Sequence, residues 1–266
     1  MTAIAVEREV ERTRAVPRRV PTTRLVAVEL RKMFDTRSGF WLMASVVIAA
    51  ILATTAVILF APDEELTYET FATAIGFPMA VTLPMIAILS VTGEWSQRSG
   101  LSTFALVPNR ARVIAAKAVS AVTVGVVSIP LAFAIGSVGN LVGTAITGTE
   151  TVWNVSLTDG LYIVSGNVLG LLVGFMLGVL IRNSAGAIVA YFVYSLLLPT
   201  LFGLLASTQV WFRDLQPWVD ITYATNPLFE GGPVGEQWAH LGSAVTLWLL
   251  LPLAVGLMLV MRSEVK

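Results

Sequence analysis

Few residues of this chain could carry out chemistry, and most of those that could are charged. The chain has no cysteine and one histidine, His240, which excludes a thiolate centre and a histidine-rich metal site. None of its three lysines, Lys32, Lys117 and Lys266, stands in the GxxxxGK[ST] loop that binds nucleotide phosphates. We therefore expect no enzymatic activity, no metal site and no cofactor in this chain.

The longest polar interruption of the apolar sequence is residues 93–117, GEWSQRSGLSTFALVPNRARVIAAK. Its charged side chains are Glu94, Arg98, Arg110, Arg112 and Lys117. Its centre is not simply hydrophilic, and the stretch predicts a helix, a break, a short amphipathic helix, a proline turn and a further helix.

The middle of this stretch predicts a short amphipathic helix. Leu101, Phe104 and Ala105 are spaced i, i+3 and i+4, so they share one helical face. Gly100 can end the preceding helix, while Pro108 ends the short helix and suits the first turn of the next one. Such an element presents an apolar and basic surface at a membrane face. The alternative is a plain solvated connector between two spans.

The composition indicates an integral membrane protein. Of 266 residues, 56% are hydrophobic and only 13% are charged, which is too apolar for an ordinary soluble domain. Apolar runs close to the ~20 residues needed to cross a bilayer recur along the chain. They lie at about 40–60, 70–92, 113–136, 161–181, 185–205 and 241–261. We predict an all-α fold with six transmembrane helices, in which residues 38–266 form the membrane domain.

Two segments precede the first span. Residues 1–21 are charged and interrupted by prolines, so we expect a disordered cytoplasmic tail. Residues 22–37 predict an amphipathic helix that lies on the cytoplasmic membrane surface, with basic residues on its flanks. Its apolar face would consist of Val26, Leu30, Met33 and Phe34.

The distribution of basic residues predicts the orientation. With the N-terminus inside, sixteen of the 17 Lys and Arg residues are cytoplasmic and only Arg213 is outside. The positive-inside rule therefore predicts cytoplasmic termini in the cell (plasma or inner) membrane, with residues 93–117 also facing the cytoplasm.

Glycines and prolines mark two of the spans. The fourth span has glycines at every fourth position, which predicts a strip for close helix packing: Gly166, Gly170, Gly174 and Gly178. Pro78 and Pro84 interrupt the second span and free backbone carbonyls. They indicate either a kinked helix beside a transport pathway or a packing irregularity.

No ionisable residue is clearly buried in a predicted span, since Glu94 and Lys117 stand at span edges, where Lys117 would snorkel to the surface. This argues against a proton-driven carrier, which normally needs ionisable relays within the membrane. Asn140, just past the third span, and Asn167 are expected to hydrogen-bond within the bundle. If the protein moves a substrate uphill, the energy must come from another chain.

Residues 93–117 resemble the segment between spans two and three of permease subunits of type-2 ATP-binding-cassette (ABC) exporters. In that family a Glu closes the second span, a Gly opens a short helix, and a Pro with basic residues precedes a Lys at the third span. Glu94, Gly100, Pro108 and Lys117 match these positions, with Arg110 and Arg112 as the basic residues. The hydropathy resemblance covers essentially the whole chain, but only this stretch is motif-like.

The resemblance implies a set of partners and roles. A separate nucleotide-binding ATPase would hold ATP and Mg²⁺, the short helix would be its coupling helix, and Leu101 and Phe104 would insert towards it. Glu94 and Arg98 would belong to a charged network at the base of span two. Arg110 and Arg112 would contact the ATPase or bind anionic lipid. A second permease subunit would complete a homodimer or a heterodimer.

These expectations combine into one function. The chain would be the permease of an ABC exporter for a hydrophobic or amphipathic substrate, such as a drug, a lipid or a peptide. Its partners would be the ATPase, a second permease subunit and membrane lipid, with no nucleic acid. The alternative is an integral-membrane assembly or immunity factor that transports nothing.

Overall fold

The computed structural model describes residues 20–35, 37–96 and 109–262. Within these ranges the chain forms helices and no β-strand, and six helical segments are long and apolar enough to cross a membrane. They are Gly39–Phe60, Tyr68–Trp95, Arg110–Thr147, Leu157–Ile181, Ser184–Thr208 and Gln237–Arg262. The prediction of a helical protein with six candidate membrane spans is confirmed. The predicted coupling helix and nearly all of the predicted tail lie outside the described residues.

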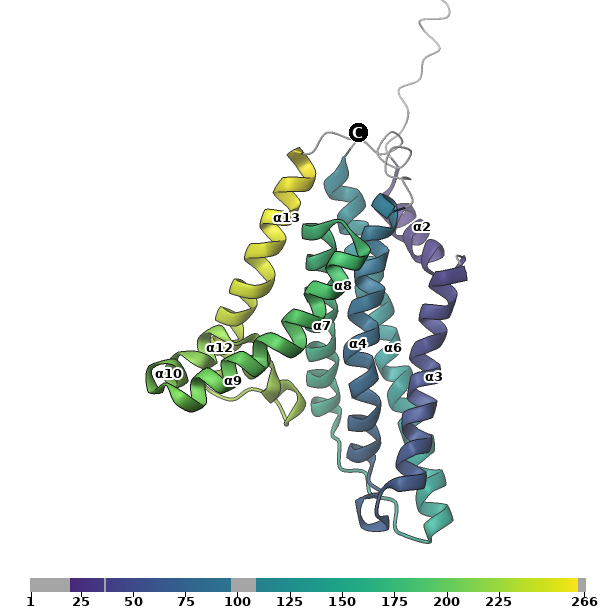
Figure 1. Cartoon of the computed structure of the whole chain (residues 1–266). Coiled ribbons are helices and arrows are strands. Elements are labelled where there is room, and N and C mark those ends of the chain that lie inside the picture. The colour runs from purple at the N-terminus through teal and green to yellow at the C-terminus, as the bar shows by residue number, and fades with distance from the viewer. Residues whose placement is uncertain (1–19, 36, 97–108, 263–266) are drawn as a thin grey trace, which may run out of the picture.

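The first five α-helices of the described chain form a bundle around α4 (Figure 1). Their bounds are α2 Thr22–Asp35, α3 Arg37–Phe60, α4 Tyr68–Ser96, α6 Arg110–Thr147 and α7 Leu157–Ile181. Helix α4 packs against α3, α6 and α7, and the short helix α2 packs against α3 and α6 at one end of the bundle. The core between them is apolar and includes Leu83, Val91, Leu171, Phe175 and Val179.

The rest of the chain is built from shorter segments beside this bundle (Figure 1). After α8 (Ser184–Phe192) come η2 (Val193–Leu197), α9 (Leu198–Thr208), α10 (Val210–Val219), α11 (Ile221–Thr225), η3 (Asn226–Phe229), α12 (Gln237–Val245), η4 (Thr246–Leu250) and α13 (Leu251–Arg262). Helix α13 then packs against α7. A short turn, η1 (Asp63–Glu65), joins α3 to α4.

Helix α6 is longer than the predicted span at 113–136. It has 38 residues, about 57 Å of helix, against a hydrocarbon core of about 30 Å. The helix ends at Gly148, whose left-handed conformation (φ 71°) caps it. Helix α6 therefore continues to Thr147, past the predicted end of this span at 136.

The glycines near the predicted end of this span serve packing. An added Cβ at Gly139 or Gly143 would lie 3.0 or 3.3 Å from ring atoms of Phe71 on α4. Asn140, between them, is fully buried inside α6, and its Nδ2 donates to the carbonyl oxygen of Val152 at 3.0 Å. Small residues here allow α6 to continue past the bulky Phe71 ring.

Candidate functional site

Lys117, the eighth residue of α6, has a buried ammonium group. Its side chain donates to Glu29 Oε2 at 2.5 Å and to the carbonyl oxygen of Ser90 at 3.0 Å. Its Nζ also lies 3.3 Å from Glu94 Oε1. Two of the three N–H donors of the ammonium therefore form hydrogen bonds, and Glu94 adds an ion pair. Lys117 thereby joins α6 to both α2 and α4.

A second lysine completes the arrangement. Lys32 Nζ donates to Glu29 Oε1 at 2.7 Å and to Glu94 Oε1 at 3.4 Å, and its side chain is 46% exposed. We call Glu29, Lys32, Glu94 and Lys117 the charge cluster. Two ammonium groups and two carboxylates give it a formal charge of zero. This balance allows burial, because an unpaired charge in a low-dielectric interior is very costly.

The charge cluster shifts the pKa values of its two members on α2. Burial by itself raises the pKa of the Glu29 carboxyl, but the charge of Lys117 and hydrogen bonds from Lys117 and Lys32 outweigh it, so that pKa is lowered. Burial likewise lowers the pKa of Lys32, and its hydrogen bond to Glu29 with the two nearby carboxylates raises it above its ordinary value. Both groups are therefore charged at neutral pH.

The prediction that no charged residue is clearly buried in a span is wrong at the end of the bundle where α2 packs. Glu94 is 6% exposed and Lys117 is 3% exposed, so Lys117 does not snorkel to the surface. The two residues appeared to stand at span edges because hydropathy cannot show that α2 covers them. Helix α2 supplies the missing partner, Glu29.

Sequence reasoning missed Glu29, although a signal was present. Glu29 follows Val26 by three positions and precedes Met33 by four, so it lies within the apolar stripe of α2. It is 7% exposed, whereas Phe34, which we expected on the packing face, is 51% exposed. A carboxylate inside an apolar stripe indicates a buried partner, but Lys117 is 88 positions away in the sequence.

Arg110 and Arg112 contact other parts of the same chain. Arg110 Nη1 donates to the carbonyl oxygen of Val260 at 2.8 Å, near the end of α13, where a helix favours a cation. Arg112 Nη2 donates to the carbonyl oxygen of Val20 at 2.6 Å and lies 3.2 Å from Thr22 Oγ1. These contacts fix the start of α6 to α13 and to the start of α2.

The end of α4 is also tied to α8. Thr92 Oγ1 and Ser184 Oγ are 2.8 Å apart, and Thr92 is fully buried. With the charge cluster, this bond places the last turns of α4 in contact with α2, α6 and α8. The other predicted coupling residues, Arg98, Gly100, Leu101, Phe104 and Pro108, lie outside the described residues.

The four glycines of the predicted strip on α7 have different surroundings. An added Cβ at Gly174 would lie 2.6 Å from the carbonyl oxygen of Pro84, and one at Gly178 would lie 3.2 Å from Val91 Cβ, both on α4. At Gly166 it would lie 2.5 Å from the Phe229 ring of η3. At Gly170 it would meet no heavy atom within 4 Å. Gly174 is thus where the two backbones approach most closely.

Comparison with known proteins gives no family for the chain. No protein-family model matches it, and a search of curated proteins finds no match.

Proposed function

We propose that this chain is the membrane-spanning permease subunit of an ABC exporter. It would reside in the cell membrane with both termini in the cytoplasm and move a hydrophobic or amphipathic substrate with ATP hydrolysed by a partner subunit. The observation that carries this proposal is the charge cluster. It joins α2 to α4 and α6, the two helices that flank residues 97–108.

A joint of this kind suits the transmission of force. The buried side chain of Lys117 makes short contacts with Glu29 and with the carbonyl oxygen of Ser90, and hydrogen bonds in such networks strengthen one another. Helices α2, α4 and α6 would therefore respond together at this end of the bundle. In the proposed arrangement an ATPase pushes on residues 97–108 and on α2, which lies along the cytoplasmic membrane surface. The displacement would then reach the spans through Lys117 and Glu94.

The distribution of buried charge supports an external energy source. The buried charged side chains in the described part of the chain are Glu29, Glu94, Lys117 and Asp220. The first three form the charge cluster, and Asp220 caps α11 by accepting from the backbone N–H groups of Thr222 and Tyr223. None of these groups is placed as a proton relay halfway through a span, which a proton-driven carrier would need.

The proposed second permease subunit has available apolar surface. Large apolar side chains are exposed along α8, η2 and α9: Val189, Val193, Leu196, Leu197, Leu201 and Leu204. Helices that face lipid or another subunit have such surfaces. The same face would serve a homodimer or a heterodimer.

Co-purification tests the proposal. The full chain carrying an affinity tag is expressed in its native host, extracted in detergent, and its companions are identified by mass spectrometry. We expect an ATPase with a nucleotide-binding cassette at a level comparable to the chain itself, and a much lower level with the Leu101→Ala/Phe104→Ala variant. A membrane complex without such an ATPase would refute the proposal and favour the assembly or immunity factor.

A further inference from the structure

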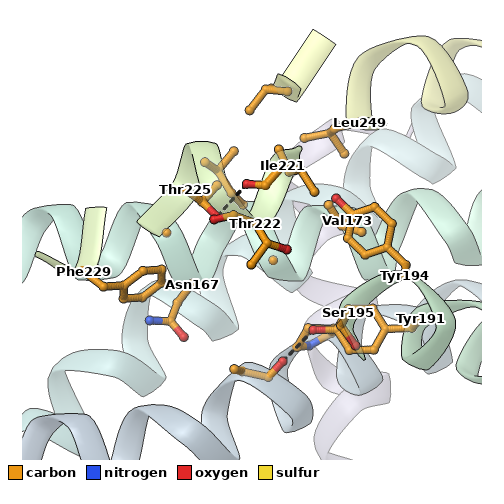
Figure 2. A pocket seen from close by; sticks show the side chains of 16 residues that line it. Asn167, Val173, Tyr191, Tyr194, Ser195, Ile221, Thr222, Thr225, Phe229 and Leu249 are labelled. Carbon is orange, nitrogen blue, oxygen red and sulfur yellow. Dashed lines mark hydrogen bonds between the residues drawn. The ribbon is translucent and has the colours of Figure 1, made fainter. Parts of the chain in front are cut away.

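A cavity of about 200 Å³ lies among α4, α7, α11 and the segments η2, η3 and η4 (Figure 2). Its wall is mostly apolar and includes Pro84, Val173, Ile221, Phe229 and Leu249. No charged side chain is among its lining residues. Gly170 also lines it, which explains the open space beside that glycine.

Several polar groups of the wall are hydrogen-bonded within the protein. The Tyr191 hydroxyl donates at 2.6 Å to the carbonyl oxygen of Ala80, four residues before Pro84. That carbonyl lacks its usual helical donor because proline has no N–H. Asn167 Nδ2 donates to the carbonyl oxygen of Ile163 at 2.9 Å. These groups stabilise the wall.

Tyr194 differs from them. Its hydroxyl oxygen is buried and has no hydrogen-bond partner within the described part of the chain. Figure 2 shows Tyr194 at the cavity beside Val173. A buried hydroxyl can both donate and accept, and leaving it unpaired is costly. Most such groups in native proteins have a partner, so this one requires an explanation.

The wall also contains two rare backbone conformations. Segment η2, which carries Tyr194 and Ser195, and segment η4, which carries Leu249, are both π-helical. Each is followed by a proline, Pro199 or Pro252, which cannot donate to the regular helical ladder. Single π-helical turns within α-helices are frequent at functional sites. Here they widen the two helices that enclose the cavity.

We propose that this cavity binds a small neutral amphiphile, with an apolar body and one hydroxyl or carbonyl group that hydrogen-bonds to Tyr194. The volume resembles that of apolar cavities that accept a molecule the size of benzene. A charged ligand is excluded because no lining residue would pair with its charge. This inference does not depend on the proposed function, since the site lies within one chain and needs no ATPase.

Photolabelling of the purified full chain in lipid nanodiscs tests the site. The probes are octanol carrying a diazirine and the matching diazirine-bearing octane without the hydroxyl. After illumination, labelled peptides are identified by mass spectrometry. We expect the alcohol to label residues of α7, η2 and α11 saturably and to be displaced by unlabelled octanol.

Two variants distinguish the cavity from nonspecific labelling by lipid-soluble probes. Gly170→Leu places a side chain in the open space and should abolish saturable labelling, whereas Gly203→Leu, at an exposed glycine of α9 with open surroundings, should not. Tyr194→Phe should weaken binding of the alcohol about three- to tenfold and leave the alkane unchanged. Tyr223→Phe, outside the cavity lining, is its matched control.

The outcomes separate clearly. Loss of alcohol labelling in Gly170→Leu together with an alcohol-specific loss in Tyr194→Phe supports the site. Equal labelling by alcohol and alkane in all variants, or no saturable labelling of the wild type, overturns it and leaves the cavity to water. Tyr194→Phe fills no space and adds no bulk, so it tests the site even if Gly170→Leu fails to fold.

Discussion

Lys117 contacts two helices besides its own, so the effect of removing its charge can be estimated. In Lys117→Met the carboxylates of Glu29 and Glu94 lose their most buried partner, with only the half-exposed Lys32 remaining. Removing one partner of a buried ion pair commonly costs about 3–5 kcal/mol. We expect a loss of this size in chemical unfolding of the detergent-purified protein.

Arg31 provides the matched control. It pairs with Asp35 on the exposed face of α2, where the side chains are 80% and 62% exposed. Pairs of this kind contribute about 0.5 kcal/mol or less. If Lys117→Met were no more destabilising than Arg31→Ala, the buried cluster would not be what holds α2 to the bundle.

The charge cluster should also make stability depend on pH. The pKa of Glu29 is lower in the folded state than in the unfolded state. At pH values between these two pKa values, the unfolded state therefore binds more protons than the folded state. The contribution of Glu29 to folding stability is therefore fully present above its unfolded-state pKa, and it is lost as pH falls through its folded-state pKa. Conversely, the raised pKa of Lys32 gives stability that is present below its unfolded pKa and lost as pH rises through its folded pKa.

Melting temperatures measured across pH check this expectation. The wild type should lose stability on the acid side more steeply than Glu29→Gln, which cannot titrate at this position. If the melting temperatures of the two proteins fell in parallel as the pH is lowered, protonation of Glu29 would not be coupled to unfolding.

At the residue scale, the sequence could indicate which side chains were charged but could not pair them. Glu94 and Lys117 were recognised as the charged ends of two spans, and Glu29 was overlooked because its partners are distant in the sequence. The contacts of Arg110 with Val260 and of Arg112 with Val20 were not predicted, and they leave the predicted role of both arginines towards an ATPase or lipid untested. Long-range pairing depends on how helices are arranged, which local spacing does not specify.

At the element scale, the contact between α4 and α7 depends on Gly174 more than on Gly170, one turn away. Gly174→Ala would place a Cβ against the backbone of Pro84, and such overpacking typically costs about 1–3 kcal/mol. Gly170→Ala would meet open space and should be neutral or stabilising by up to ~1 kcal/mol. Thermal unfolding of the two variants, one turn apart, measures the difference. Equal destabilisation would mean that α4 and α7 are not packed at Gly174.

The elements themselves were predictable to different degrees. Hydropathy located all six candidate spans because each is a long apolar run. It placed the end of the third span at 136, whereas α6 continues to Thr147 and glycines there accommodate the Phe71 and Ile75 side chains of α4. The π-helical segments and the cavity between them were not predicted, since both depend on tertiary packing around prolines.

At the scale of the whole molecule, the proposed orientation predicts which residues are accessible from each side. Because the chain has no cysteine, single-cysteine variants can be labelled without background. We expect Ser102→Cys, outside the described residues, to react only from the cytoplasm, and Thr149→Cys and Val234→Cys to react only from outside. Val234 is preferred to the neighbouring Gly232, because Gly232 has a positive φ of 100° and a Cβ there would meet Tyr162.

Labelling with a membrane-impermeant maleimide on intact and permeabilised cells distinguishes the two sides. Reaction of Ser102→Cys in intact cells would reverse the orientation. It would also remove the proposed access of a cytoplasmic ATPase to residues 93–117.

The most direct test of the proposed function measures ATP hydrolysis by the partner ATPase with and without this chain in reconstituted membranes. We predict that the wild-type chain changes the hydrolysis rate, that Leu101→Ala/Phe104→Ala removes this change, and that deletion of residues 1–16 leaves it intact. The two truncated side chains would be interface anchors, which commonly contribute ~2 kcal/mol or more to binding. A double variant that retains the effect while the tail deletion abolishes it would contradict the proposed coupling through residues 93–117.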